Sequence, residues 1–257
     1  MTTHQLCDIL NQFAPLSLQD SWDNSGLQID NNNATVTGVL ICLDITEQSL
    51  QEAIEKGCNV IVAHHPLLFQ GVKQIGHNNY IHRCIRLAIL HQIAIYANHT
   101  PLDKVQGGTN WLLGTQIGLQ HITYLQAGET PSYGIIGELT QPMDQTAFVN
   151  TLKEKLGIAQ IRGSQMGNTP IKRVAICSGS GSFLIDNAMA CQADAFICGD
   201  LKHHDFHKAD NRLLLLDIGH FESEIGTKEL FFSLLSKKIP TFVLHLSEKE
   251  RSPIYCY

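Results

Sequence analysis

Histidines and carboxylates follow four short apolar segments of this chain, and both residue types are ligands of divalent metal ions in proteins. In the first half, His64 and His65 follow one segment, and His99 follows another with Asp103 four residues later. In the second half, Asp200 and then a histidine–glutamate pair follow the other two segments. The four segments are residues 60–63, 93–97, 195–198 and 213–216.

In each half, a histidine precedes an acid by four residues: His99 precedes Asp103, and His220 precedes Glu224. Four residues is about one turn of α-helix, so a helix beginning there would direct both side chains of a pair towards one point. A carboxylate can bridge two ions, and two-metal sites hold their ions about 3.5–4 Å apart. The two pairs, together with the adjacent histidines of the first half, therefore predict a metal site.

Two other polar clusters have alternative interpretations. His203, His204 and His207 fit a solvated helix face as well as a set of ligands. Residues 177–182 (CSGSGS) follow an expected strand and precede an expected helix, where backbone N–H groups can bind a phosphate. The segment lacks the lysine of a P-loop, which favours a tight turn.

Apolar β-branched segments alternate with amphipathic segments, which is typical of an α/β protein with largely parallel strands. Carboxyl ends of parallel strands meet at one edge of a sheet, so we expect the histidine and acid clusters to converge. Strands are expected at residues 36–43, 60–63, 93–97, 133–139, 173–177, 195–198, 213–216 and 241–246. Helices are expected at residues 4–13, 47–56, 80–91, 109–117, 145–156, 183–191 and 224–238.

The two halves have a similar order of expected elements. Each begins with a helix and a short segment, and strands then alternate with helices. This similarity predicts an internal duplication, with one α/β repeat over residues 1–125 and a second over 126–257. The alternative is that any α/β protein resembles itself this loosely.

Composition indicates a packed globular protein, because 44% of the residues are hydrophobic and 16% are charged. The formal charge of −6 argues against a nucleic-acid partner. No apolar segment approaches the roughly 18–20 residues of a membrane helix, and the N-terminus lacks the pattern of a signal peptide. Eight cysteines without a C-x-x-C pair are typical of reduced thiols, so we expect a cytoplasmic protein without a membrane partner.

Five segments of the chain together resemble the GTP cyclohydrolase I type 2 family, also called the NGG-interacting-factor-three-like family. They are residues 21–28 (SWDNSGLQ), 62–67 (VAHHPL), 99–103 (HTPLD), 199–205 (GDLKHHD) and 219–224 (GHFESE). The resemblance extends over almost the whole chain. It implies two similar, intertwined α/β domains with mixed sheets, a metal site between them at the C-terminal ends of strands, and no large inserted domain.

The resemblance also implies a dinuclear metal centre in a toroidal homohexamer that acts on a small molecule. The two divalent ions would be Zn, Fe, Mn, Ni or Co. The ligands that the resemblance implies are His64, His65, Asp103, His220 and Glu224. His99 would then lie beside the ligands or on the substrate side.

GTP cyclohydrolase activity is the reaction that the resemblance implies, with water activated by metal attacking the guanine ring. His99 and Glu224 are the expected catalytic residues. His99, or alternatively His204, is expected to move protons, because the unperturbed histidine pKa is about 6.5. The same centre would also suit a metal-dependent phosphoester hydrolase, and a non-enzymatic metal-binding scaffold is a third alternative.

Overall fold

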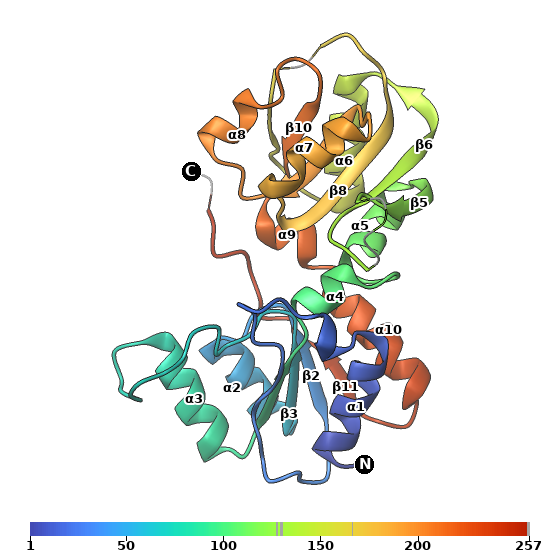
Figure 1. Cartoon of the computed structure of the whole chain (residues 1–257). Helices are drawn as coiled ribbons and strands as arrows, with labels where there is room; N and C mark the ends of the chain where they lie inside the picture. The colour runs from blue at the N-terminus through green and yellow to red at the C-terminus, as the bar shows by residue number, and fades with distance from the viewer. Residues whose placement is uncertain (127, 129–130, 166, 256–257) are drawn as a thin grey trace. The chain divides into compact units, whose positions relative to one another are not determined.

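The computed structural model describes residues 1–126, 128, 131–165 and 167–255. They form two compact units, each built around one β-sheet with helices packed on it (Figure 1). Unit 1 comprises Met1–Leu102 and Thr227–Tyr257, and unit 2 comprises Asp103–Gly226. Within the described ranges, no helix is long and apolar enough to span a membrane.

The sheet of unit 1 has the strand order β1-β4-β3-β2-β11. Its strands are β1 (Gly26–Ile29), β2 (Val39–Cys42), β3 (Val60–Ala63), β4 (Ala94–Ala97) and β11 (Leu244–Leu246). The last four are parallel, and β1 is antiparallel to β4 at the edge. Every residue of β2, β3 and β4 is buried, as expected for parallel strands covered on both faces.

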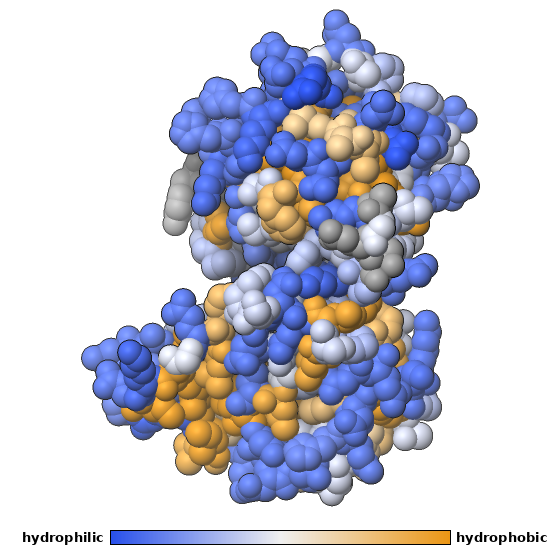
Figure 2. All heavy atoms as spheres, in the orientation of Figure 1, coloured by the Kyte–Doolittle hydropathy of each residue, from blue (hydrophilic) through white to orange (hydrophobic). Residues whose placement is uncertain are grey.

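Helices cover both faces of this sheet: α2 and α3 lie on one side, and α1 and α10 lie on the other (Figure 1). Their bounds are α1 (Thr3–Phe13), α2 (Glu47–Glu55), α3 (Tyr80–Leu90) and α10 (Thr227–Lys238), with a 3₁₀ turn at Leu16–Leu18. Leu50 of α2 and Ile85 of α3 share one apolar cluster with Leu40 and Ile61 of the sheet. Apolar surface remains over α3 (Figure 2), where Leu90 is 75% exposed.

The sheet of unit 2 has the order β5-β6-β8-β9-β10-β7. Its strands are β5 (Gln120–Tyr124), β6 (Ile135–Met143), β7 (Arg162–Gly163), β8 (Ile171–Ser180), β9 (Ala195–Gly199) and β10 (Leu214–Asp217). Strands β8, β9 and β10 are parallel, whereas β5, β6 and β7 pair antiparallel. Both sheets are therefore mixed, as expected.

The helices of unit 2 contribute to two apolar clusters. Leu113 and Phe148, from α5 and α6, belong to one cluster, and Ile185 of α7 belongs to the other. The bounds are α5 (Thr109–Ile117), α6 (Gln145–Leu156), α7 (Ile185–Ala190), α8 (His203–His207) and α9 (His220–Glu224), with a 3₁₀ turn at Ser182–Leu184. A further short helix, α4 (Thr100–Lys104), contains the unit boundary.

The two sheets share a pattern of four strands. In unit 1 the edge strand β1 is followed by β4, β3 and β2, and in unit 2 the edge strand β7 is followed by β10, β9 and β8. In both, the edge strand comes first in the chain and pairs antiparallel with the last of the three parallel strands. An internal duplication, as predicted from the sequence, would produce the same order of four strands in both sheets.

The units exchange segments, so their bounds differ from the repeats predicted at residues 1–125 and 126–257. Elements α5 and β5 fall within the first repeat but belong to unit 2. Elements α10 and β11 fall within the second repeat but belong to unit 1. The expected intertwining of the two domains thus takes the form of a reciprocal exchange of one helix and one strand.

Two elements differ from the expected ones, and the first difference affects the site. The single helix expected at 224–238 is divided into α9 and α10, so Glu224 ends a short helix of its own. Strand β5 was not expected, because it is an edge strand whose residues Gln120, His121 and Thr123 are exposed polar side chains. Polar edge strands lack the apolar alternation that identifies a half-buried strand.

Candidate metal centre

Three histidines of unit 1 lie together at the carboxyl edge of its sheet. His64 and His65 directly follow β3, and His99 lies two residues after the parallel neighbour β4. One ring nitrogen of each lies within 4.8 Å of the others. The ring centroids of His64 and His65 are 4.9 Å apart, and those of His65 and His99 are 5.5 Å apart. Parallel pairing therefore gathers these side chains, as their position after strands predicted.

Each of the two adjacent histidines has an oxygen acceptor at its Nδ1 atom. Nδ1 of the buried His64 lies 3.1 Å from the backbone oxygen of Asn98. Nδ1 of His65 lies 2.8 Å from Oδ1 of Asp44. Because a carbonyl and a carboxylate can only accept, both Nδ1 atoms must donate. In the neutral imidazole the lone pair that can ligate a metal ion then lies on Nε2.

His99 is held in the same way by Asp23, whose side chain is fully buried. Nδ1 of His99 lies 2.9 Å from Oδ1 of Asp23, and the hydroxyls of Thr100 and Ser25 donate to Oδ2. Burial by itself would raise the pKa of Asp23, but the hydrogen bonds from His99, Thr100 and Ser25 outweigh it and hold the pKa well below its usual range. Asp23 is therefore a charged group that fixes the His99 ring.

In unit 2, helix α9 brings His220 and Glu224 together. Their Nε2 and Oε2 atoms are 3.1 Å apart, and Glu224 is 3% exposed. The spacing of four residues therefore has the helical consequence expected from the sequence. Nδ1 of His220 lies 2.7 Å from Oδ2 of Asp200, which directly follows β9. Nδ1 of His220 is thus also paired with a carboxylate, and its Nε2 lies next to Glu224.

His220 and Glu224 fit in this place because two neighbouring positions are glycines without a Cβ atom. A Cβ atom at Gly179 would overlap Oε1 of Glu224, and one at Gly199 would lie 2.9 Å from the backbone nitrogen of His220. Gly179 also has φ of +64°, in the left-handed region that favours glycine. Its N–H donates to the hydroxyl of Ser223 at 2.8 Å. Cys177–Ser180 thus belong to the end of β8 and not to the tight turn that the sequence favoured, and Gly179 on this strand end braces α9.

Asp103, the remaining acid of the predicted set, lies on α4 and is buried. Its backbone oxygen accepts a hydrogen bond from Nδ2 of Asn110 at 2.9 Å. Burial raises the pKa of Cys177 well above its ordinary value, and the nearby charges of Asp103 and Glu224 raise it further. Both carboxylates therefore lie near one buried thiol, which stays protonated and does not compete for metal as a thiolate.

The histidines of α8 form a separate cluster. One ring nitrogen of each of His203, His204 and His207 lies within 4.8 Å of the others, and all three residues are exposed. Their exposure favours the solvated helix face, which was one of the two alternatives that the sequence left open.

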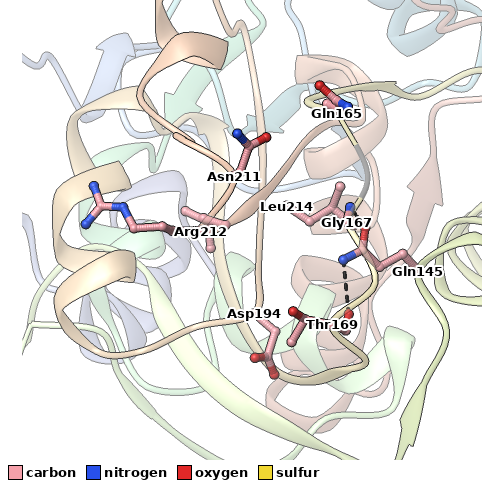
Figure 3. Close-up of a pocket in the computed structure, with 9 residues that line it drawn as sticks. Gln145, Gln165, Gly167, Thr169, Asp194, Asn211, Arg212 and Leu214 are labelled. Carbon is pink, nitrogen blue, oxygen red and sulfur yellow. Dashed lines mark hydrogen bonds between the residues drawn. The ribbon is translucent and has the colours of Figure 1, made fainter.

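A polar pocket of unit 2 offers little room for a ligand (Figure 3). Its volume is about 40 Å³, and Gln145, Asp194 and Arg212 are among its lining residues. Gln145 spans part of it, since its Nε2 donates to the oxygen of Thr169 and its Oε1 accepts from the N–H of Gly167. The pocket suits a few water molecules rather than a nucleotide.

The sequence did not indicate a site role for Asp23 or Asp44, and it placed Asp200 after a strand without indicating its bond to His220. Asp44 and Asp200 each stand within two residues of a strand end, and this position was the available signal. Asp23 precedes its strand, and nothing local to it indicates a histidine partner 76 residues away.

We predict that Asp200→Asn lowers the affinity for divalent metal about 10–100-fold, because the orienting carboxylate at Nδ1 of His220 is lost. Asp200 has φ of +56°, which asparagine also tolerates, so the change isolates the carboxylate. Competition with a coloured chelator measures the affinity. Asp186→Asn, at an exposed acid of α7, is the matched control and keeps the wild-type value. Equal affinities of the two variants would contradict the orienting role.

Comparison with known proteins shows similarity along nearly the whole chain. The model of the family Duf34/NIF3 (NGG1p interacting factor 3) matches residues 1–253. A "GTP cyclohydrolase 1 type 2 homolog" of Clostridium perfringens is 34% identical over 230 residues, covering 87% of each chain. Another protein of that name, from Campylobacter jejuni, is 32% identical and covers 87% of this chain and 88% of its own. The crystal structure of Staphylococcus aureus hypothetical protein SA1388 aligns with a TM-score of 0.93 and 30% identity, covering 100% of this chain and 99% of that one.

Proposed function

Because the chain belongs to the Duf34/NIF3 (NGG1p interacting factor 3) family, we propose that it is a hydrolase that depends on two divalent metal ions. The proposed donor set combines three imidazoles with two carboxylates. The proposed ligands are His64, His65, Asp103, His220 and Glu224. This donor set suits Zn, Fe, Mn, Ni or Co, since imidazole binds these metals and a carboxylate can bridge two ions.

One observation supports the proposal most directly: in both units, each histidine of the set has an oxygen acceptor at Nδ1. The acceptors are Asn98 for His64, Asp44 for His65 and Asp200 for His220. Histidines that ligate metal almost always donate their other ring N–H to a carboxylate, a carbonyl or water. A histidine with only a packing role does not need this arrangement, and here it recurs at three positions and again at His99.

The chemistry of such a centre is hydrolytic, because bound ions lower the pKa of water and polarise a substrate oxygen. His99 is proposed to move a proton through Nε2, since Asp23 fixes its ring by bonding Nδ1. Glu224 is proposed to hold the ions and to balance their charge from its buried position. Asp44 and Asp200 keep the ligand rings in place, so the side chains need little reorganisation during the reaction.

We propose GTP as the substrate, in accordance with the names of the Clostridium and Campylobacter relatives. Two water molecules would open the five-membered ring of guanine and release its C8 atom as formate. Protein loaded with Zn²⁺, Mn²⁺ or Fe²⁺ is therefore expected to release formate from GTP, and protein stripped by a chelator is not. Full metal loading without formate would refute the cyclohydrolase activity. Release of phosphate in its place would favour the phosphoester hydrolase.

We further propose a homohexamer in the cytoplasm with a small-molecule substrate and without a membrane or nucleic-acid partner. The homohexamer rests on the family resemblance of the sequence, and the thiols are consistent with a reducing compartment. In the described part of the chain, Cys7, Cys42, Cys58, Cys84, Cys177, Cys191 and Cys198 are free. Light scattering after size exclusion tests the assembly, and a monomer mass would contradict it.

A further inference from the structure

Two exposed aromatic side chains, Trp22 and Phe69, flank His99 in unit 1. Their ring centroids lie 6.1 Å and 6.3 Å from that of His99, and both rings meet it edge-on. The centroids of Trp22 and Phe69 are 5.9 Å apart, with the planes tilted by 59°. Trp22 is 55% exposed and Phe69 is 45% exposed. We call this pair the aromatic corner, and it adjoins the histidine cluster.

Hydrogen bonds connect the two segments that form the aromatic corner. Nδ2 of Asn24 donates to the backbone oxygen of Leu68 at 2.5 Å, and the N–H of Leu68 donates to Oε1 of Gln28 at 2.9 Å. The segment that carries Phe69 is thereby fastened to the segment that carries Trp22. The two segments are fixed to each other although neither ring is buried, and such preorganisation of the backbone reduces the cost of binding.

Four polar residues near Trp22 serve the local structure. Asp23 fixes the ring of His99, and the hydroxyl of Ser25 accepts from the backbone N–H of His99 at 3.0 Å. Gln28 and Asn24 hold the backbone of Leu68. Trp22 stands in the same segment with more than half of its surface in water, which is costly for the largest apolar side chain. A ligand that covers the ring would remove that cost.

We propose that the aromatic corner binds a planar aromatic heterocycle, such as a purine base, and places it beside His99. Trp and Phe rings stack on the flat face of any nucleobase. Each such stacking contact strengthens the binding of the base about tenfold or more. A base held against the aromatic corner lies next to the histidine cluster that the proposed reaction uses. This inference rests on the proposed function, because it takes the bound heterocycle to be the substrate of that reaction.

Tryptophan fluorescence tests this inference, because the chain has two tryptophans. In the Trp111→Phe variant, Trp22 is the sole reporter, and Trp111 lies in unit 2 against Tyr124. The full-length variant is stripped of metal and titrated with guanosine and, separately, with ribose 5-phosphate. Guanosine is expected to quench Trp22 saturably, and ribose 5-phosphate is not. Phe69→Leu in this background is expected to weaken the binding of guanosine about tenfold.

Phe183→Leu is the matched control, because Phe183 is 57% exposed and lies in unit 2. It is expected to leave the affinity for guanosine within about twofold of the parent. The inference fails if guanosine does not quench saturably, if ribose 5-phosphate quenches equally, or if Phe183→Leu weakens binding as much as Phe69→Leu. It also fails if iodide does not reach Trp22 without ligand, since another copy of the chain would then cover the aromatic corner. Because the protein is metal-free, these outcomes are distinct from a failure to release formate.

Discussion

Glu224→Gln is expected to abolish the release of formate from GTP and to lower the affinity for divalent metal about 100-fold or more. The substitution keeps the shape of the side chain but removes its charge, and an amide does not bridge two cations as a carboxylate does. Glu224 is 3% exposed and lies 3.1 Å from Nε2 of His220, so the lost charge has no substitute from solvent. Metal content after dialysis, by elemental analysis, and formate release measure the two effects.

Glu222→Gln provides the control for this variant. Glu222 lies on the same helix two residues earlier and is only partly buried. We expect Glu222→Gln to keep the wild-type metal content and the wild-type rate of formate release. That result would show that Glu224→Gln acts through the metal centre and not through the net charge of α9. Wild-type metal content and rate in Glu224→Gln would exclude Glu224 from the centre.

Gly179→Ala is expected to displace Glu224 and to empty the metal centre while the fold persists. The new Cβ would overlap Oε1 of Glu224 and lie 3.4 Å from Cε1 of His220. The φ of +64° adds strain of about 1–2 kcal/mol for alanine. We expect the free energy of unfolding to fall by about 2–4 kcal/mol in total, which a denaturant titration measures. The metal content is expected to fall as far as in Glu224→Gln.

Gly157→Ala separates backbone strain from the collision with the carboxylate. Gly157 follows α6 with φ of +66°, and a Cβ there would contact none of the residues that the structure describes. Only the strain of about 1–2 kcal/mol remains, and metal content stays at the wild-type level. If Gly179→Ala retained as much metal as Gly157→Ala, the space at Gly179 would have no role in the centre.

Features that depend on a few neighbouring residues were predictable from the sequence. The H-x-x-x-E spacing predicted that His220 and Glu224 face each other, because a helical turn alone sets that geometry. The buried strand at 60–63 and the histidines after it were predictable for a similar reason, since a run of apolar β-branched residues marks a covered parallel strand. The α/β class follows from the alternation of such segments along the chain.

Hydrogen bonds between residues far apart in the chain were not predictable. The carboxylate of Glu250 accepts hydrogen bonds from the N–H groups of Leu43 and Asp44, about 200 residues earlier, and so fixes the acid that orients His65. Lys228 lies 3.2 Å from the same carboxylate. No local pattern connects these positions, because they meet only through the exchange of segments. The same exchange moved the unit boundaries away from the repeat boundary.

That exchange also sets the order in which the chain can fold as it leaves the ribosome. Unit 2 is continuous from Asp103 to Gly226, so all of its strands are available before α10 and β11 have been synthesised. Until then β2 is an open edge strand in unit 1, a template for pairing with another nascent chain. We therefore expect the sheet of unit 1 to be completed only after residues 227–246 have been translated, and a fragment that ends before Thr227 to be prone to aggregation.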